Sequence, residues 1–313
     1  ESNDLTTAKD LYVKLSNFYE EQGLWTEYEL IIQEMFDFAK QHGDVDFEAE
    51  CYNKLGISCC LNGNNTESLA NFSKALELNF LQNDSIAVSN SYENIGLVYK
   101  DLGQYNKALE FQHKSLSIRE CIYHPRLINT YLNIATVYSL LGNDAMHFHY
   151  LKRALAHSNS TKIKNSQNAI LNNELAKYYN DNGQLDSALI CYQNVVDFSK
   201  EDGWLRGMAV GMGNIAEIYQ SQGKYDLALE KHRESLKMSL AINDCMSIAE
   251  QYLFMSVVFN LTNQVDSALF YASNSLLKSE ECSLAKERQN ALQYLSELYE
   301  EQKDYEKALA YNK

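Results

Sequence analysis

The strongest constraint on the fold is a repeat of about 40 residues that runs through almost the whole chain. The pattern Gly-x-Tyr-x-x-Ala-Leu occurs at residues 103–109 and 223–229, and residues 183–189 keep it with Leu in place of Tyr. The turn glycine, or the residue that replaces it, recurs at intervals of 39 to 41 residues. The eight turn positions are Gly23, Gly63, Gly103, Gly142, Gly183, Gly223, Asn263 and Lys303. A constant period of this size is typical of stacked copies of one supersecondary unit.

The apolar residues on either side of each turn have helical spacing. In one unit they stand at i, i+3, i+4 and i+7, as Tyr92, Ile95, Gly96 and Tyr99. The glycine that follows suits the left-handed conformation in which many helices end. One Pro and 13 Gly are too few for the many turns of a strand-rich sandwich or barrel. The sequence therefore predicts an all-α solenoid of about eight helical hairpins that forms a single domain over residues 1–313.

The repeated blocks resemble the tetratricopeptide repeat, a helix–turn–helix unit with the pattern W-x2-L-G-x2-Y, then A-x3-F, then P. Tyr stands in the Trp position at Tyr12, Tyr52, Tyr92, Tyr131 and Tyr252. The closing Pro is missing throughout, and the unit has about 40 residues instead of 34. The longer unit is similar to the repeats of kinesin light chains and of bacterial peptide-sensing regulators. The resemblance implies a right-handed superhelix whose first helices line a concave groove.

The resemblance also implies which residues face that groove. The position before the Leu-Gly pair defines a column, here named the ladder column, which contains Lys14, Lys54, Asn94, Asn133, Glu174, Asn214, Phe254 and Tyr294. Three Asn in one column resemble the asparagine ladder by which several such proteins hold an extended peptide. An Asn amide both donates and accepts, so it can pair with a peptide backbone of any sequence. The alternative is that Asn is merely tolerated at a wet surface.

Neighbouring columns extend the predicted groove. Ile57, Leu97 and Thr136 form an apolar strip that could seat ligand side chains or simply pack one repeat against the next. The full set of candidate groove residues is Lys54, Asn94, Asn133, Asn214, Ile57, Leu97, Thr136, Asn90, Asn129, Glu174 and Lys177.

Chaperone-type members of the family clamp a C-terminal carboxylate with basic residues in five fixed positions. Those positions hold Val13, Asn17, Lys54, Asn90 and Asn94 here. With one basic residue among five, we expect a neutral or basic protein or peptide partner instead.

Charge and motifs exclude several other functions. The chain has 27 Lys and Arg against 42 Asp and Glu, a net charge of −15, which disfavours nucleic acid and anionic membranes as partners of this segment. No catalytic motif or phosphate-binding loop is present, so no catalytic residues and no cofactor are expected. His147 and His149 are two residues apart, whereas metal ligands on one helix are three or four apart, so no metal site is expected.

The seven cysteines include no C-x-x-C motif. We expect most of them to be small buried residues and not a disulfide framework. The adjacent pair Cys59 and Cys60 is an alternative redox site.

The favoured function is a non-catalytic module that binds protein or peptide segments. The last unit ends five residues past Ala308, which suggests a fragment of a longer chain, such as the sensory part of a bacterial regulator with a DNA-binding or histidine kinase output. The alternative is a scaffold that self-associates through its open C-terminal face. The segment contains no targeting or membrane-spanning sequence, so periplasm and cytoplasm both remain open.

Overall fold

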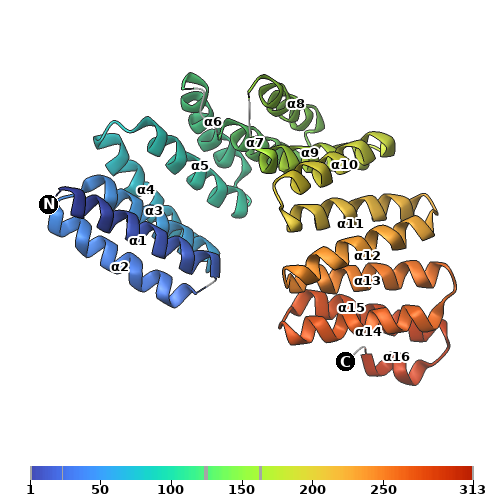
Figure 1. Ribbon diagram of the computed structural model, residues 1–313. Coiled ribbons are helices and arrows are strands. Elements are labelled where there is room, and N and C mark those ends of the chain that lie inside the picture. The colour runs from blue at the N-terminus through green and yellow to red at the C-terminus, as the bar shows by residue number, and fades with distance from the viewer. Residues whose placement is uncertain (1, 23, 123–125, 162–163, 312–313) are drawn as a thin grey trace. The chain divides into compact units, whose positions relative to one another are not determined.

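The computed structural model describes residues 2–22, 24–122, 126–161 and 164–311, which form sixteen α-helices and no strand (Figure 1). The helices are α1 (Ser2–Gln22), α2 (Trp25–His42), α3 (Val45–Leu61), α4 (Asn65–Leu81), α5 (Ser85–Asp101), α6 (Tyr105–Cys121), α7 (Leu127–Leu140), α8 (Asp144–Ser160), α9 (Asn165–Asp181), α10 (Leu185–Glu201), α11 (Leu205–Ser221), α12 (Tyr225–Ala241), α13 (Cys245–Leu261), α14 (Val265–Glu281), α15 (Ala285–Glu301) and α16 (Tyr305–Tyr311). Odd-numbered helices are the first helices of the repeats, and even-numbered helices are the second.

The regularity of the chain comes from one kind of helix end. At the end of α5, the Gly103 N–H donates to the Lys100 carbonyl at 2.9 Å, and the Gln104 N–H donates to the Tyr99 carbonyl at 2.8 Å. This pair of bonds is the Schellman motif, whose first donor residue, here Gly103, takes the left-handed conformation. The next helix begins directly after it, so from α9 onwards a helix starts every 20 residues.

Left-handed residues occur at both kinds of turn. Within the repeats, positive φ angles are found at Gly63, Gly103, Gly142, Gly183, Gly223, Asn263 and Lys303, whereas Gly23 lies outside the described residues. Between the repeats, positive φ angles are found at Gly43, Asn83, Gly203, Asn243 and Ser283. This second set was not predicted, because three of its five members are not glycine. Pro125, placed by the sequence in the link between two repeats, also lies outside the described residues.

Contacts divide the chain into two compact units, Glu1–His157 and Ser158–Lys313. Within each unit, successive helices pack on one another along the chain, as α5 does on α6 and α11 on α12. First helices of successive repeats also touch one another, as α5 touches α7 and α13 touches α15. The first helices therefore present equivalent side chains next to each other within a unit.

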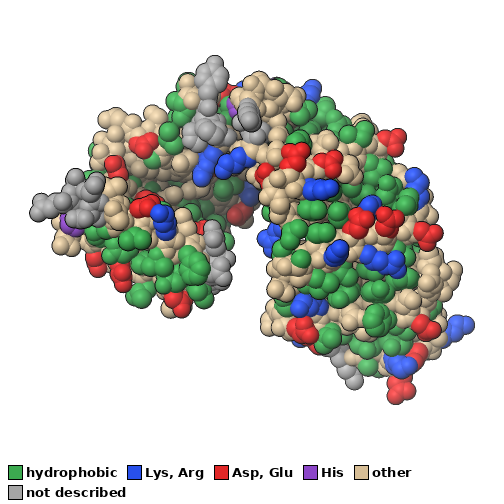
Figure 2. Space-filling model, viewed as in Figure 1, with side chains coloured by type: hydrophobic (Ala, Val, Ile, Leu, Met, Phe, Trp, Pro, Cys, Tyr) green, Lys and Arg blue, Asp and Glu red, His purple; other side chains and the backbone are tan. Residues whose placement is uncertain are grey.

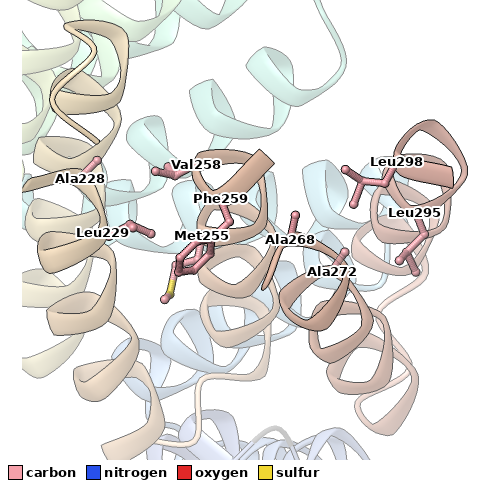
Figure 3. Packing of buried hydrophobic residues seen from close by; sticks show 9 residues of the cluster. All are labelled: Ala228, Leu229, Met255, Val258, Phe259, Ala268, Ala272, Leu295 and Leu298. Atoms are coloured by element: carbon pink, nitrogen blue, oxygen red, sulfur yellow. The ribbon is translucent and has the colours of Figure 1, made fainter. Parts of the chain in front are cut away.

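The core consists of the apolar faces of these helices (Figure 3). In one cluster, α13 places Met255 and Phe259 between the second helices on either side, which contribute Ala228 and Ala268. Both alanines are fully buried, so the small residues predicted at these positions do lie where helices approach closely. A Cβ on Gly56 would lie 2.6 Å from the ring of Phe72, so only glycine fits there.

A buried ion pair joins three helices of the first unit. Arg119 of α6 is fully buried, and its guanidinium donates to both carboxylate oxygens of Glu93 in α5 at 2.7 and 2.8 Å. The same guanidinium donates to Asn90 and to Thr130 of α7, each at 2.6 Å. Second helices of other repeats carry a small or short residue here, such as Asn79 and Ser199.

The structure corrects the expectation for two cysteines. Cys245 at the start of α13 and Cys282 after α14 form a disulfide across one helical hairpin, at a sequence separation of 37. Of the free cysteines only Cys51 is buried, whereas Cys59, Cys60 and Cys191 are half-buried and Cys121 is exposed, so the expectation that most are buried is wrong. The spacing of 37 residues gave no hint of this pair, because it matches no known local motif.

We predict that Arg119→Ala lowers the free energy of unfolding by about 3–5 kcal/mol, because it leaves the buried Glu93 carboxylate without its partner. Urea denaturation followed by circular dichroism measures the change. Lys114→Ala is the matched control: it removes an exposed ion pair with Glu110 and should cost less than about 1 kcal/mol. Equal losses in the two variants would contradict the role given to the buried pair.

We predict that reduction of the disulfide destabilises the second unit by about 2–4 kcal/mol, because the open chain gains conformational freedom when unfolded. The unfolded protein should titrate five thiols before reduction and seven after it. In a Cys245→Ser/Cys282→Ser variant, reductant should no longer change the denaturation midpoint. A count of seven thiols in protein that was never reduced would contradict the pairing.

Candidate functional site

A recurring hydrogen bond connects the predicted asparagine ladder to the preceding repeat. The residue just before the ladder column in each repeat defines a second column, here named the adjacent column, which contains Val13, Asn53, Glu93, Leu132, Asn173, Gly213, Leu253 and Gln293. Each ladder Asn donates through Nδ2 to the adjacent column of the repeat before it. The three bonds are Asn94 to Asn53 at 2.8 Å, Asn133 to Glu93 at 3.1 Å, and Asn214 to Asn173 at 3.2 Å.

These bonds orient the ladder amides but do not use all of their hydrogen-bonding groups. An Asn side chain has two N–H groups and an acceptor oxygen, and each bond uses one N–H. Asn94, Asn133 and Asn214 are all half-buried. Each of them therefore keeps an accessible acceptor and a second donor whose directions are fixed by the neighbouring helix.

Three other predicted groove residues are occupied by partners within the chain. Lys54 of α3 is buried, and its Nζ donates to Asn17 of α1 at 2.8 Å. Glu174 and Lys177 of α9 form an ion pair at 2.9 Å. Lys54 thus joins the first helices α1 and α3, and the charges of Glu174 and Lys177 neutralise each other.

The remaining predicted residues fall into two groups. Ile57 packs against the buried cluster of Phe72, Ile95 and Val98, which favours its reading as inter-repeat packing. Leu97 and Thr136 are half-buried, and the Thr136 hydroxyl donates to the carbonyl of Leu132. Asn90 accepts from Arg119, while Asn129 is exposed.

An acidic cavity of about 360 Å³ lies beside Asn90 in the first unit. Its walls include Asp46 and Glu50 from α3 and Asp84 before α5. Burial raises the pKa of the Glu50 carboxyl, with Lys54 acting in the opposite direction. The cavity therefore places three carboxylates beside the predicted groove residue Asn90.

A second cavity, of about 240 Å³, opens between α11 and α13 in the second unit. Asn214 is the one residue of the predicted groove that lines it. The other walls include Gly213, Glu217, Glu250, Gln251 and Phe254. The available signal was Gly213 itself, because every other repeat has a side chain at this position of the adjacent column.

A buried histidine contacts two side chains that line this cavity, Gln251 and Phe254. His232 of α12 is fully buried, stacks on the Phe254 ring at 5.6 Å between centroids, and donates through Nδ1 to the Gln251 Oε1 at 2.8 Å. Its Nε2 has no hydrogen-bond partner among the described residues. Burial lowers the pKa of His232, so the ring is neutral and Nδ1 carries its proton.

The described residues contain no group of three His, Cys, Asp or Glu side chains placed to hold a metal ion. None of the described helices is long and apolar enough to cross a membrane. In the view of Figure 2, acidic and basic side chains are interspersed with hydrophobic ones over the second unit.

The stacked hairpins and their polar columns define an all-α repeat protein of the superhelical class, as the sequence predicted. The family model for the tetratricopeptide repeat matches residues 47–120, 85–160 and 166–241, which is more than half of the chain. The chain belongs to the tetratricopeptide repeat family. Repeats of this kind build protein-interaction modules.

Comparisons with individual proteins agree on the fold. The photosystem I assembly protein Ycf3 of Rippkaea orientalis is 33% identical over 98 residues, which cover 31% of this chain and 52% of that protein. The chain thus spans about half the length of the curated relatives it matches.

Two solved structures are similar over nearly the whole chain. One is a signal transduction ATPase with numerous domains (STAND) from Pyrococcus horikoshii, which has a tetratricopeptide repeat sensor; it gives a TM-score of 0.71 at 13% identity, covering 94% of this chain and 44% of that one. The other is a Rap protein complexed with Competence and Sporulation Factor, with a TM-score of 0.59 at 13% identity, covering 97% and 100%. At this identity both show the fold alone.

We predict that acidification destabilises the protein through His232. Because the folded pKa is lowered, the unfolded chain binds the proton first, so stability falls as pH drops below about 6.5, the usual His pKa. The matched variant is His232→Phe, since Phe72 occupies the equivalent position of another repeat. Between pH 6.5 and 5.5, the free energy of unfolding of this variant should fall by about 1 kcal/mol less than that of the unmodified protein.

The measurement is urea denaturation at a series of pH values in both variants. The difference between the two profiles isolates His232 from His113 and His157, whose pKa values are also lowered by burial. Parallel profiles would show that His232 titrates alike in folded and unfolded protein.

Proposed function

We propose that the chain is a non-catalytic module that binds an extended protein or peptide segment along the ladder column of its first helices. The observation that carries the proposal is the recurrence of the ladder bond at Asn94, Asn133 and Asn214. One geometry is repeated at spacings of 40 and 41 residues. It fixes the directions of the amide donors and acceptors, at Asn94 and Asn133 in the first unit and at Asn214 in the second. Fixed amide groups suit the repeating amide groups of an extended backbone.

Pre-orientation matters for affinity. A free Asn side chain loses rotational freedom when it binds, and this cost subtracts from the gain of each hydrogen bond. Here the inter-repeat bond has already restricted the side chain on folding. A neutral polar backbone can therefore bind at little further entropic cost.

The charges of the groove favour a neutral or basic segment. Glu50 borders the cavity of the first unit, and Glu217 and Glu250 border that of the second. The lining of these two cavities includes no Lys, Arg or His. An acidic ligand would place like charges together in a partly dehydrated space.

A sensory role in a larger bacterial regulator is the extended form of this proposal. The similar folds of a STAND protein with a repeat sensor and of a Rap protein bound to Competence and Sporulation Factor support it. In such a protein, ligand binding would change the packing between repeats and so the state of an output domain. Introducing the ladder variant described next into the native regulator should abolish its response while leaving its abundance unchanged.

We predict that the triple variant Asn94→Ala/Asn133→Ala/Asn214→Ala loses peptide binding by tenfold or more, because it removes three pre-oriented backbone partners. The probe is a phage-displayed library of random dodecapeptides selected on the unmodified protein, with affinities of synthetic copies measured by fluorescence anisotropy. Circular dichroism checks that the variant is folded.

Asn106→Ala is the matched control, since its side chain is exposed on the second helix α6 and away from the ladder column. It should leave the affinity unchanged. Selected peptides that bind the triple variant as tightly as the unmodified protein would place their site elsewhere.

A further inference from the structure

The ladder bond is missing between α11 and α13 of the second unit, as it also is between α13 and α15, where the adjacent column holds Leu253. Between α9 and α11, Asn173 accepts from Asn214 at 3.2 Å. At the next joint, between α11 and α13, the equivalent positions hold Gly213 and Phe254. Neither residue has a side-chain hydrogen-bonding group, so no ladder bond can form there. The space that an Asn side chain would occupy at position 213 becomes part of the 240 Å³ cavity.

An unpartnered amide faces this space. Gln251 of α13 is 6% exposed, and its Oε1 is held by His232. The Nε2 of Gln251 lies close to Gly213, because a Cβ built on Gly213 would be 3.1 Å from this nitrogen. No described residue accepts a hydrogen bond from this Nε2, although the amide lines the cavity. The pocket therefore offers an amide donor, on a largely buried side chain, that can pair with an acceptor from outside the chain.

The rest of the pocket is suited to a cation. The carboxylates of Glu217 and Glu250 line it, and neither makes an ion pair or hydrogen bond with any described residue. Both glutamates are exposed at the rim of the pocket, where partial desolvation raises the pKa of each carboxyl, and the proximity of Glu250 adds to the shift of Glu217. The Phe254 ring stacks on the neutral His232 and also lines the cavity. Two unpaired carboxylates beside an aromatic ring attract an ammonium or guanidinium group.

We propose that this pocket receives a single Lys or Arg side chain of the bound segment, with the backbone carbonyl of that segment accepting from the Gln251 amide. The inference rests on the proposed function, because it assigns one position within the same groove. The amide is the reason to prefer a peptide over a free polyamine: a peptide residue supplies both a cation and an acceptor, whereas a polyamine supplies donors alone. The interruption of the ladder thus sets the residue preference of an otherwise sequence-independent groove.

The first test uses the dodecapeptides selected from the random phage library. We expect Lys or Arg at one fixed position of the selected sequences. Replacing that residue by citrulline, which has nearly the shape of Arg but no charge, should weaken binding about tenfold, equivalent to about 1.4 kcal/mol. The variant Glu217→Gln/Glu250→Gln should bind the Arg and citrulline peptides equally.

Two further variants complete the design. Glu297→Gln/Glu300→Gln removes two exposed carboxylates of the first helix α15 outside the pocket and should retain the preference for Arg. Gly213→Asn installs the residue found at Asn53 and Asn173 and should abolish the preference by filling the pocket, with only the flexible end of Gln251 having to move. Thermal melting confirms that each variant folds.

A second measurement addresses the pocket without the library. N-acetyl-arginine methylamide should give a saturation-transfer NMR signal with the unmodified protein and a much weaker one with Gly213→Asn. Acetyl-norleucine methylamide should give no signal at the pocket. No signal from the arginine derivative would overturn the assignment, as would an equal signal in Gly213→Asn. Spermidine that displaces it with higher affinity would identify a site for free polyamines instead.

The outcomes separate this inference from the function on which it rests. Peptides that depend on the ladder Asn but show no preference for Lys or Arg would overturn the pocket and leave the module's function intact. A library that yields no ladder-dependent peptide would contradict the proposed function, and the arginine derivative would then decide the pocket by itself.

Discussion

The fixed length of helix and turn is the constraint on which the rest of this structure depends. Each Schellman end places one left-handed residue between helices, and most helices have 17 residues, so equivalent positions return every 20 residues along the chain. Equivalent faces of the first helices therefore meet at each joint. The ladder bonds follow from this alignment: a helix longer or shorter by one residue would rotate the ladder column by about 100° and separate the Asn side chains.

The contacts that connect successive repeats differ from one joint between repeats to the next. Most are joined by apolar packing around small residues such as Ala228 and Ala268. One contains the buried pair of Arg119 and Glu93, and the joint of α11 and α13 has Gly213 and Phe254 in place of a ladder bond. The pair also connects core and groove, because the Glu93 carboxylate accepts both from Arg119 and from the ladder residue Asn133. A substitution in the core of this joint would thus alter the groove as well.

The sequence predicted the repeat, the helical hairpins and the family because these depend on local periodicity, which is visible without knowing the partners. It could not show that Asn83 and Ser283 take the left-handed conformation between repeats, since neither residue demands it. The pairing of Cys245 with Cys282 also required the hairpin geometry.

For the site, the column of Asn was visible in the sequence, but its partners were not. Predicting that Asn94 donates to Asn53 needs the register of two helices 41 residues apart. The sequence predicted that Lys54 faces a ligand, whereas in the structure its Nζ donates to the Asn17 side chain. The pocket over Gly213 was missed for a related reason: its defining feature is a side chain that is absent, and periodicity analysis looks for residues that are present.

The ladder bond also limits how such an array can evolve. Each bond has its donor in one repeat and its acceptor in the repeat before it, so half of every joint is encoded about 40 residues away from the other half. Duplication or loss of one whole repeat moves a donor next to a new acceptor. Where the new neighbours are both polar, the ladder continues; where they are Gly and Phe, a new pocket appears. Recombination between repeats would therefore change what the groove recognises without a single point mutation.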